Sequence, residues 1–161
     1  MRKLLGISLF VGLMLISTAA LAEPKAEIFG GYQYTHLDGG PNLNGWNGAL
    51  TGNFNSFLGI RADLSGSYKN GFKFTTYTFG PEVSLRLPVI HPFAHALFGG
   101  ATASGGGAST TGFDMMYGGG VDMGSGPIAF RVGQFDWMVT RFSGFTDKNN
   151  VRFSTGLVIR F

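Results

Sequence analysis

The chain has 161 residues, of which 27 are glycine, 14% are aromatic and only 13% are charged. A soluble domain carries roughly 25% charged residues, and a disordered chain combines low hydrophobicity with high charge, so the composition excludes disorder and is unusual for a soluble domain. A net charge of +3 provides no cationic field for nucleic acid. The length fits one folded domain. The chain has no cysteine, which excludes a disulfide framework, a thiolate nucleophile and a zinc–thiolate cluster.

The N-terminal segment has the layout of a secretory signal peptide. Two basic residues precede an almost unbroken apolar run over residues 4–16, and Ala20 and Ala22 provide a small-x-small cleavage site. We expect a cleaved signal peptide over residues 1–22 and one exported domain over residues 23–161. A retained membrane helix is the alternative, but the apolar run is shorter than the ~20 residues that a span requires.

Beyond this segment, apolar and polar residues alternate with a period of two, which indicates strands with two chemically different faces. Eight strands are predicted, over residues 26–37, 46–54, 57–68, 72–87, 93–103, 112–123, 128–142 and 150–161. The segment 93–103 is apolar at both parities, so its faces are left unassigned.

The predicted connections alternate between two kinds along the chain. Polar stretches rich in Gly, Asn and Ser are predicted as loops, over residues 38–45, 69–71, 104–111 and 143–149. Short turns with Pro, Asn or Gly are predicted over residues 53–56, 88–92 and 124–127. In an up-and-down meander, all connections of one kind lie at the same end, an asymmetry typical of membrane barrels.

The seventh predicted strand contains a change of phase. Its apolar residues over 128–132 have one parity, and those over 135–139 have the opposite one. A single-residue slip near Gly133 would keep both sets on one face, and a β-bulge produces such a slip. We therefore predict a bulge here, which would direct Arg131, Gln134 and Asp136 to the same polar side.

The direction of the apolar face distinguishes a soluble barrel or sandwich, where it lines the core, from a membrane barrel, where it meets lipid. The polar face here has small residues and few charges, unlike a solvated surface. The apolar face carries large aromatics near strand ends, where interfacial girdles lie: Tyr32, Tyr34, Trp46, Tyr68, Tyr77, Trp137, Phe142 and Phe161. We predict an all-β, eight-stranded antiparallel transmembrane β-barrel, with a secreted sandwich as the alternative.

Ten charged residues fall on the polar face and balance one another. The acids are Glu27, Asp63, Glu82, Asp122 and Asp136, and the bases are Arg61, Arg86, Arg131, Arg152 and Arg160. Buried charges require partners, and arginine suits bidentate pairing with carboxylates. The interior of an eight-stranded barrel is only just wide enough for side chains. We therefore predict a lumen plugged by this charge network.

The last predicted strand carries a further signal. Residues 154–161 read Ser-Thr-Gly-Leu-Val-Ile-Arg-Phe, which resembles the C-terminal β-signal of outer-membrane proteins. The residues at the positions of that signal are Ser154, Gly156, Ile159 and Phe161. With the first strand, Glu-Ile-Phe-Gly-Gly-Tyr-Gln-Tyr over 27–34, the chain resembles eight-stranded barrel domains of the OmpA, OmpX and opacity-protein type over about residues 25–161.

That family includes a few enzymes, the lipid A deacylases, which resemble serine esterases and have a His-x-Ser arrangement. None of His36, His91 and His95 has a serine two positions further on. His95 is interpreted as a strand histidine satisfied by hydrogen bonds, and His91 as a turn or interface residue. We expect no enzymatic activity, no catalytic residue, no cofactor and no metal ligand.

The loop charges Asp38, Asp147 and Lys148 could bind a divalent ion or lipopolysaccharide, although isolated loop charges are usually just solvated. The resemblance implies residence in the outer membrane, contact with its lipid and lipopolysaccharide, insertion by the barrel-assembly machinery, and a monomer. The expected role is structural, adhesive or another surface interaction. A narrow gated channel is the alternative, and a lipid-modifying enzyme is a weaker one.

Overall fold

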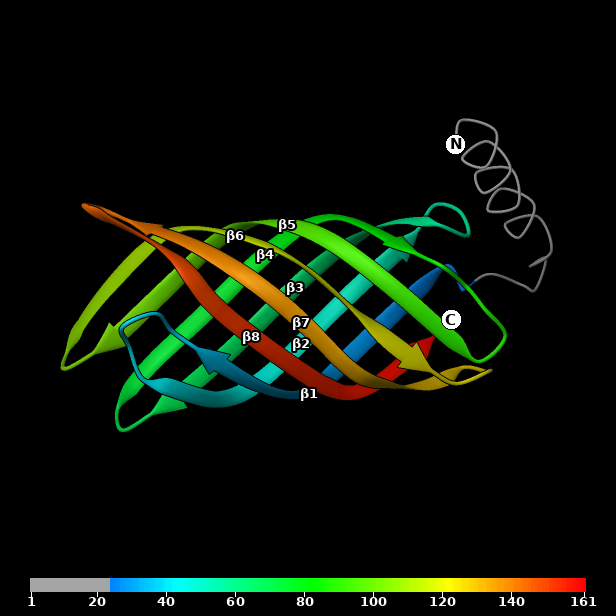
Figure 1. The fold of residues 1–161 in the computed structure, drawn as a ribbon, viewed down its shortest axis with the longest axis horizontal. Coiled ribbons are helices and arrows are strands. Elements are labelled where there is room, and N and C mark those ends of the chain that lie inside the picture. The colour runs from blue at the N-terminus through cyan, green and yellow to red at the C-terminus, as the bar shows by residue number, and fades with distance from the viewer. Residues whose placement is uncertain (1–23) are drawn as a thin grey trace, which may run out of the picture.

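The computed structural model describes residues 24–161, so the predicted signal peptide, with Ala20 and Ala22, lies outside the described residues. The strands are β1 (Ala26–His36), β2 (Asn42–Asn53), β3 (Leu58–Lys69), β4 (Phe72–Ser84), β5 (Ile90–Gly105), β6 (Ala108–Met123), β7 (Ile128–Phe142) and β8 (Phe145–Arg160). Each pairs antiparallel with its sequence neighbours, and β8 pairs with β1, so the sheet closes (Figure 1). The predicted class and topology are confirmed. No helix within residues 24–161 is long and apolar enough to cross a membrane.

The two ends of the barrel differ. We call the end that holds Lys25 and Phe161 the proximal end; the Lys25 amide donates to the Phe161 carbonyl there at 2.7 Å. The opposite, distal end lies at the left of Figure 1 and holds the hairpin turns that follow β1, β3, β5 and β7.

The distal connections are shorter than predicted, because strand residues occupy half of the expected loop over 38–45 and most of the expected loops over 104–111 and 143–149. The turns that remain are residues 37–41, 70–71, 106–107 and 143–144. Gly106 and Gly107 have φ angles of 60° and 84°. Positive φ at both central positions defines a type I′ turn, whose twist matches that of the paired strands. Strand pairing therefore continues up to the turn. The Gly- and Ser-rich segments that were predicted as loops are the ends of paired hairpins.

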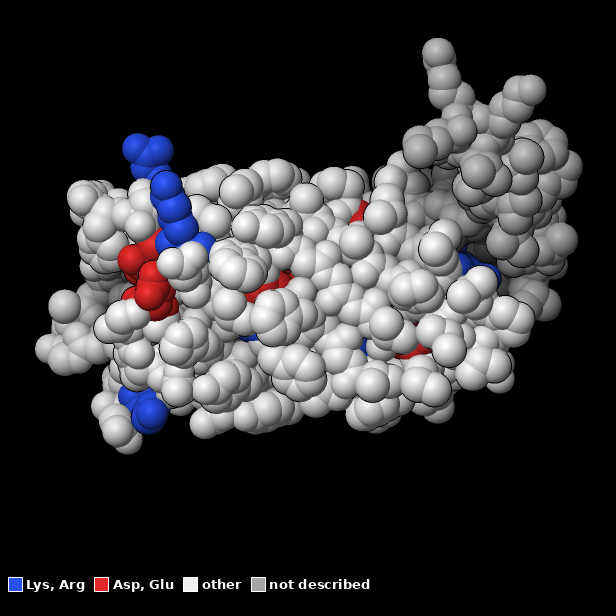
Figure 2. Space-filling model, viewed as in Figure 1, with Lys and Arg blue, Asp and Glu red and all other residues white. Residues whose placement is uncertain are grey.

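Large apolar side chains cover the outer surface of the barrel. Leu50, Phe79 and Phe135 expose 53%, 65% and 53% of their surface. Charged side chains gather at the distal end, and the middle of the barrel shows almost none (Figure 2). Because soluble proteins bury most large apolar residues, this is the inverted arrangement of a transmembrane barrel. The predicted direction of the apolar face is confirmed.

Two face assignments need correction or completion. Phe142, predicted in the outer girdle, is only 8% exposed and faces the lumen, because it shares the parity of the buried Met138 and Thr140. The strand β5, whose faces were left unassigned, buries Phe93, His95, Leu97 and Ala101 and turns the alternate residues outward.

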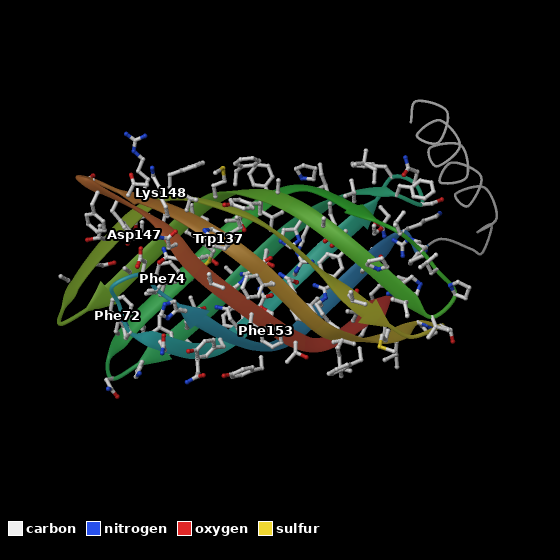
Figure 3. All side chains as sticks on the ribbon, viewed as in Figure 1. Phe72, Phe74, Trp137, Asp147, Lys148 and Phe153 are labelled. Carbon is white, nitrogen blue, oxygen red and sulfur yellow. The ribbon has the colours of Figure 1, made fainter. Side chains whose placement is uncertain are left out.

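The lumen also contains apolar clusters that the predicted polar interior did not include. The larger one lies toward the distal end and consists of Leu37, Leu43, Phe74, Leu97, Ala101, Met116, Met138 and Phe142. Phe72 packs against it, and Figure 3 places Phe72 and Phe74 at the distal end. A smaller cluster contains Phe29, Ala49, Ala129 and Val158. The distal lumen therefore contains packed apolar side chains beside buried polar ones such as Gln33, Thr35 and Ser67.

The predicted bulge in β7 is confirmed. Arg131 pairs with Gly156 of β8 and Gln134 pairs with Ser154, so β7 has one extra residue between these pairs. The register with β6 shifts at the same place. Apolar residues before and after the bulge consequently both face outward despite their opposite parity.

Glycines on the inner face allow β1 and β8 to approach closely at the seam where the sheet closes. Gly31 pairs with Gly156 across this seam. A Cβ atom on Gly31 would lie 2.0 Å from the Thr155 carbonyl oxygen, and one on Gly156 would lie 2.3 Å from the Gly30 oxygen. Both contacts are with backbone, which cannot move aside as a flexible side chain does.

We expect Gly31→Val to destabilise the barrel by about 3 kcal/mol or to prevent its closure, because the added side chain overpacks the seam. Gly30→Val is the matched control, since a Cβ there meets nothing within 4 Å. Urea unfolding in detergent and the shift of the folded band on unheated gels measure the effect. Equal stability of the two variants would contradict the close approach at the seam.

Candidate functional site

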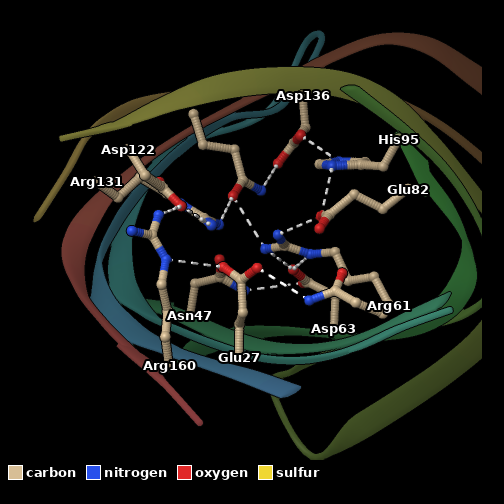
Figure 4. A network of polar contacts seen from close by, with 12 residues as sticks. Glu27, Asn47, Arg61, Asp63, Glu82, His95, Asp122, Arg131, Asp136 and Arg160 are labelled. Carbon is tan, nitrogen blue, oxygen red and sulfur yellow. Dashed lines mark hydrogen bonds and ion pairs between the residues drawn. The ribbon is translucent and has the colours of Figure 1, made fainter. Parts of the chain in front are cut away.

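The structure brings all ten predicted charged residues together inside the barrel, and each contacts an opposite charge. Figure 4 labels eight of the ten within their network of polar contacts. They come from β1, β3, β4, β6, β7, β8 and the turn after β4. The alternation of the strands accounts for this, because every second residue points into the lumen. The charged residues of these strands therefore point into the lumen, where Arg86 reaches them from the turn.

The centre of this network is a continuous chain of ion pairs. Arg61 contacts Glu82 and Asp63, each at 3.0 Å. Arg152 contacts Asp63 at 2.7 Å and Asp136 at 2.6 Å. The two arginine side chains are completely buried. A buried ion costs several kcal/mol of desolvation, which only close and multiple pairing offsets.

Gln134 connects this chain to the rest of the lumen. Its Oε1 accepts hydrogen bonds from Arg61 at 3.0 Å and from Arg131 at 2.6 Å, and its Nε2 donates to Asp136 at 2.7 Å. The bulge in β7 is what directs Arg131, Gln134 and Asp136 inward together. One amide thus satisfies two guanidinium groups and one carboxylate.

Arg131 is also held by aromatic rings. Its guanidinium carbon lies 4.3 Å from the centre of the Phe29 ring and 4.1 Å from that of Phe93, within the range of cation–π attraction. Two of its nitrogens donate to Asp122, at 2.7 and 3.0 Å, in a bidentate pair. The planar guanidinium is therefore fixed on its faces and at its edge.

Glu27 organises the proximal end of the network. It accepts hydrogen bonds from Arg86 at 2.6 Å, from Asn53 at 3.1 Å and from Arg160 at 3.4 Å. Arg160 lies 3.8 Å from Asp122 and so joins this end to the layer around Arg131. These contacts link β1 to β8 and to the turn after β4.

The predicted network omitted two buried ionisable residues. The Nε2 atom of His95 lies 2.8 Å from Asp136, and its Nδ1 atom lies 3.9 Å from Glu82. Asp114 accepts a hydrogen bond from Thr140 at 2.8 Å. Parity already placed Asp114 on the polar face, but no cationic residue in the sequence marked it as paired. His95 was missed as a network member because the faces of β5 could not be assigned, although its hydrogen bonding was expected.

The other predicted positions lie apart from this network. The β-signal residues are on or directly after β8, with Ser154 buried in the lumen and with Ile159 and Phe161 exposed. The loop charge Asp38 is held beside β8, since its amide donates to Asn150 at 2.8 Å and its carboxylate accepts from Asn149 at 3.1 Å.

Asp147 and Lys148 lie at the distal end of β8, near Trp137 (Figure 3). The indole nitrogen of Trp137 donates to the Lys148 carbonyl at 2.7 Å. Within residues 24–161, no group of three or more His, Asp or Glu side chains is placed to hold a metal ion. His36, at the distal end of β1, contacts Asn42 at 2.5 Å.

The network is made of side chains that pair with one another inside the barrel. The central side chains are buried and already paired, so a molecule outside the barrel has no access to Arg61, Arg152 or Asp136. Perturbed ionisable groups of this kind occur in catalytic sites and in structural ion-pair networks. The burial of Arg61, Arg152 and Asp136 and their close ion pairs fit a structural ion-pair network.

No protein-family model matches the chain, and no curated protein matches it. Solved structures do resemble it. Neisserial surface protein A, NspA, aligns with a TM-score of 0.60 and 14% identity over 84% of this chain and 96% of that one. Ail, the attachment invasion locus protein of Yersinia pestis, aligns with a TM-score of 0.54 and 19% identity over 86% of this chain and 99% of its own.

The N-terminal β-barrel domain of Pseudomonas aeruginosa OprF aligns with a TM-score of 0.56 and 11% identity, over 86% of this chain and 98% of that domain. This chain has the fold of the small outer-membrane β-barrels. At these identities the likeness concerns the fold, and it agrees with the predicted resemblance to barrels of the OmpA and OmpX type.

We expect Arg152→Gln to lower the free energy of unfolding by about 3–5 kcal/mol, because it leaves Asp63 and Asp136 buried without their shared cation. Arg141→Gln is the matched control: Arg141 is exposed on β7, and a surface change of this kind stays within about 0.5 kcal/mol. Urea titration of the refolded barrel, followed by tryptophan fluorescence, measures both. Indistinguishable midpoints would contradict a stabilising role for the central ion pairs.

Proposed function

We propose that this protein is a small integral outer-membrane β-barrel that presents its distal hairpins at the cell surface and has a structural, adhesive or other surface-interaction role. The observation that carries the proposal is the apolar outer surface of a closed barrel with charges gathered at one end. Such a surface is stable only in lipid. The names of Ail, an attachment protein, and NspA, a surface protein, agree with a role at the cell surface.

The proposed route to the membrane begins with export through the signal peptide over residues 1–22. The barrel-assembly machinery then recognises the β-signal formed by Ser154, Gly156, Ile159 and Phe161. The closed sheet leaves no free strand edge within the apolar belt, which favours a monomer.

The distal end is proposed to face outward. Its exposed basic residues Lys69, Lys73, Arg141 and Lys148 suit the phosphates of lipopolysaccharide, the proposed partner together with membrane lipid. Asp38 and Asp147 lie at the same end, in the β1–β2 turn and near the start of β8. Figure 2 shows acidic and basic side chains close together there. The hairpins are the only described segments that such an orientation would offer to partners outside the cell.

The proposed barrel is closed to solutes. The apolar distal cluster and the charge network occupy the lumen in succession, and both consist of buried side chains. Opening a path would require breaking several ion pairs and exposing Leu97 and Met116 to water. A structural or surface-interaction role is therefore favoured over the gated-channel alternative, and the protein is proposed to have no enzymatic activity.

A peptide tag inserted between Gly106 and Gly107, at the tip of the β5–β6 hairpin, is expected to bind antibody on intact Gram-negative cells. The same tag inserted after Gly126, in a proximal turn, is expected to bind only after the outer membrane is permeabilised. Deleting Phe161 should lower the surface signal several-fold, because the β-signal is incomplete. Recovery of the mature chain in the soluble periplasm, unaffected by Phe161 deletion, would contradict the proposal.

The purified barrel is expected to produce no discrete conductance steps in planar lipid bilayers. Arg61→Gln should be equally silent, because the distal apolar cluster still closes the lumen. Protein with a confirmed folded band on unheated gels is used for both recordings. Steps that appear in the wild type and change in Arg61→Gln or Glu82→Gln would favour the channel.

A further inference from the structure

The outer surface of β2, β3 and β4 contains a hollow of about 520 Å³ within the apolar belt. Its sides include Trp46, Leu50, Tyr77 and Phe79, and the small residues Gly48 and Ala62 lie between them. Large side chains cover most of the belt, so a groove appears where two of the outward positions have almost no side chain.

The register of the sheet explains the shape of this groove. Gly48 pairs with Leu64, which pairs with Tyr77, and in the next row Ala62 lies between Leu50 and Phe79. The depression therefore runs across three strands in the region that the apolar belt assigns to lipid tails. Its lining is almost entirely apolar and suits a hydrocarbon chain.

A positive charge lies above the groove on the same strands. Lys73 is in the row of Tyr68, and its ammonium lies 6.0 Å from the centre of the Tyr68 ring. Trp46 donates to the Tyr68 hydroxyl at 3.3 Å, so an interfacial aromatic pair separates the charge from the groove. Lys73 is four residues from Tyr77 along β4, or about 13 Å of strand. Lys69, at the end of β3, adds a second exposed ammonium to this hairpin.

The geometry points to a lipid-binding site in which the groove takes one acyl chain of a membrane lipid and Lys73 binds its anionic, phosphate-bearing headgroup. The order of apolar groove, aromatic pair and ammonium matches the order of acyl chain, interface and phosphate in such a lipid. The site rests on the proposed location in a membrane and adds to it a preferred lipid class at one side of the barrel.

Tryptophan quenching by brominated acyl chains tests this site, because Trp46 borders the groove and Trp137 faces outward on β7, away from it. Trp137→Phe leaves Trp46 as the reporter, and Trp46→Phe leaves Trp137 as the reference. Each variant is reconstituted in phosphatidylcholine vesicles that contain a minor fraction of brominated phosphatidylglycerol or of brominated phosphatidylcholine.

We expect brominated phosphatidylglycerol to be enriched about fivefold beside Trp46 over brominated phosphatidylcholine, with no such preference beside Trp137. Lys73→Gln should remove the preference for the anionic lipid. Ala62→Leu, which fills the groove, should lower the quenching of Trp46, whereas Ala94→Leu on the outer face of β5 should not.

The possible failures are distinguishable. Equal quenching of Trp46 and Trp137 by both lipids would overturn the binding site while supporting a barrel embedded in lipid. A preference at Trp46 that survives Lys73→Gln would overturn the assignment of the headgroup. Absence of quenching of either tryptophan by any brominated lipid would overturn the membrane location and the site with it.

Discussion

A closed sheet of eight strands leaves an interior that only side chains can fill, and the rest of this structure depends on how that narrow lumen is occupied. Arginine is long enough to cross it, but a buried guanidinium is tolerated only beside carboxylates. Gly31 and Gly156 let β1 and β8 approach, which draws the walls together around the ion pairs. The ion pair between Glu27 of β1 and Arg160 of β8 crosses the same seam, so closure of the sheet brings these charges together.

The polarity of the inner and outer faces also changes along the strands. In the middle of the barrel the lumen is polar and the exterior apolar. Toward the distal end the interior becomes apolar, with Leu43 and Phe74 buried, and the exterior carries pairs such as Thr102 and Thr111, whose hydroxyls lie 3.1 Å apart. The distal extension is thus organised as a soluble barrel is, because water replaces lipid around it.

Much of the fold could be predicted because a period of two is a property of the chain itself. Eight strands, the outward aromatics and even the bulge in β7 follow from parity, since one extra residue inverts it. Loop lengths could not be predicted in this way. Glycine and serine are common in loops, yet here Gly106 and Gly107 form a two-residue turn at the tip of a long hairpin. The register of β5 and β6 shows that pairing continues up to Gly105 and Ala108.

The site was harder to predict than the fold. Alternation shows which residues share a face of the strand, but not whether lipid, water or other side chains surround that face at each level of the barrel. The segment 93–103 is apolar at both parities for this reason: Phe98 faces outward within the apolar belt, while Leu97 and Ala101 face inward in the distal cluster. Because a polar interior was predicted for the whole barrel, the distal apolar cluster was not predicted. The faces of the segment 93–103, which includes His95, could not be assigned. Leu97 and Phe98 are adjacent and both apolar, one inside and one outside, so the apolar belt and the distal cluster overlap along β5 and parity alone cannot separate them.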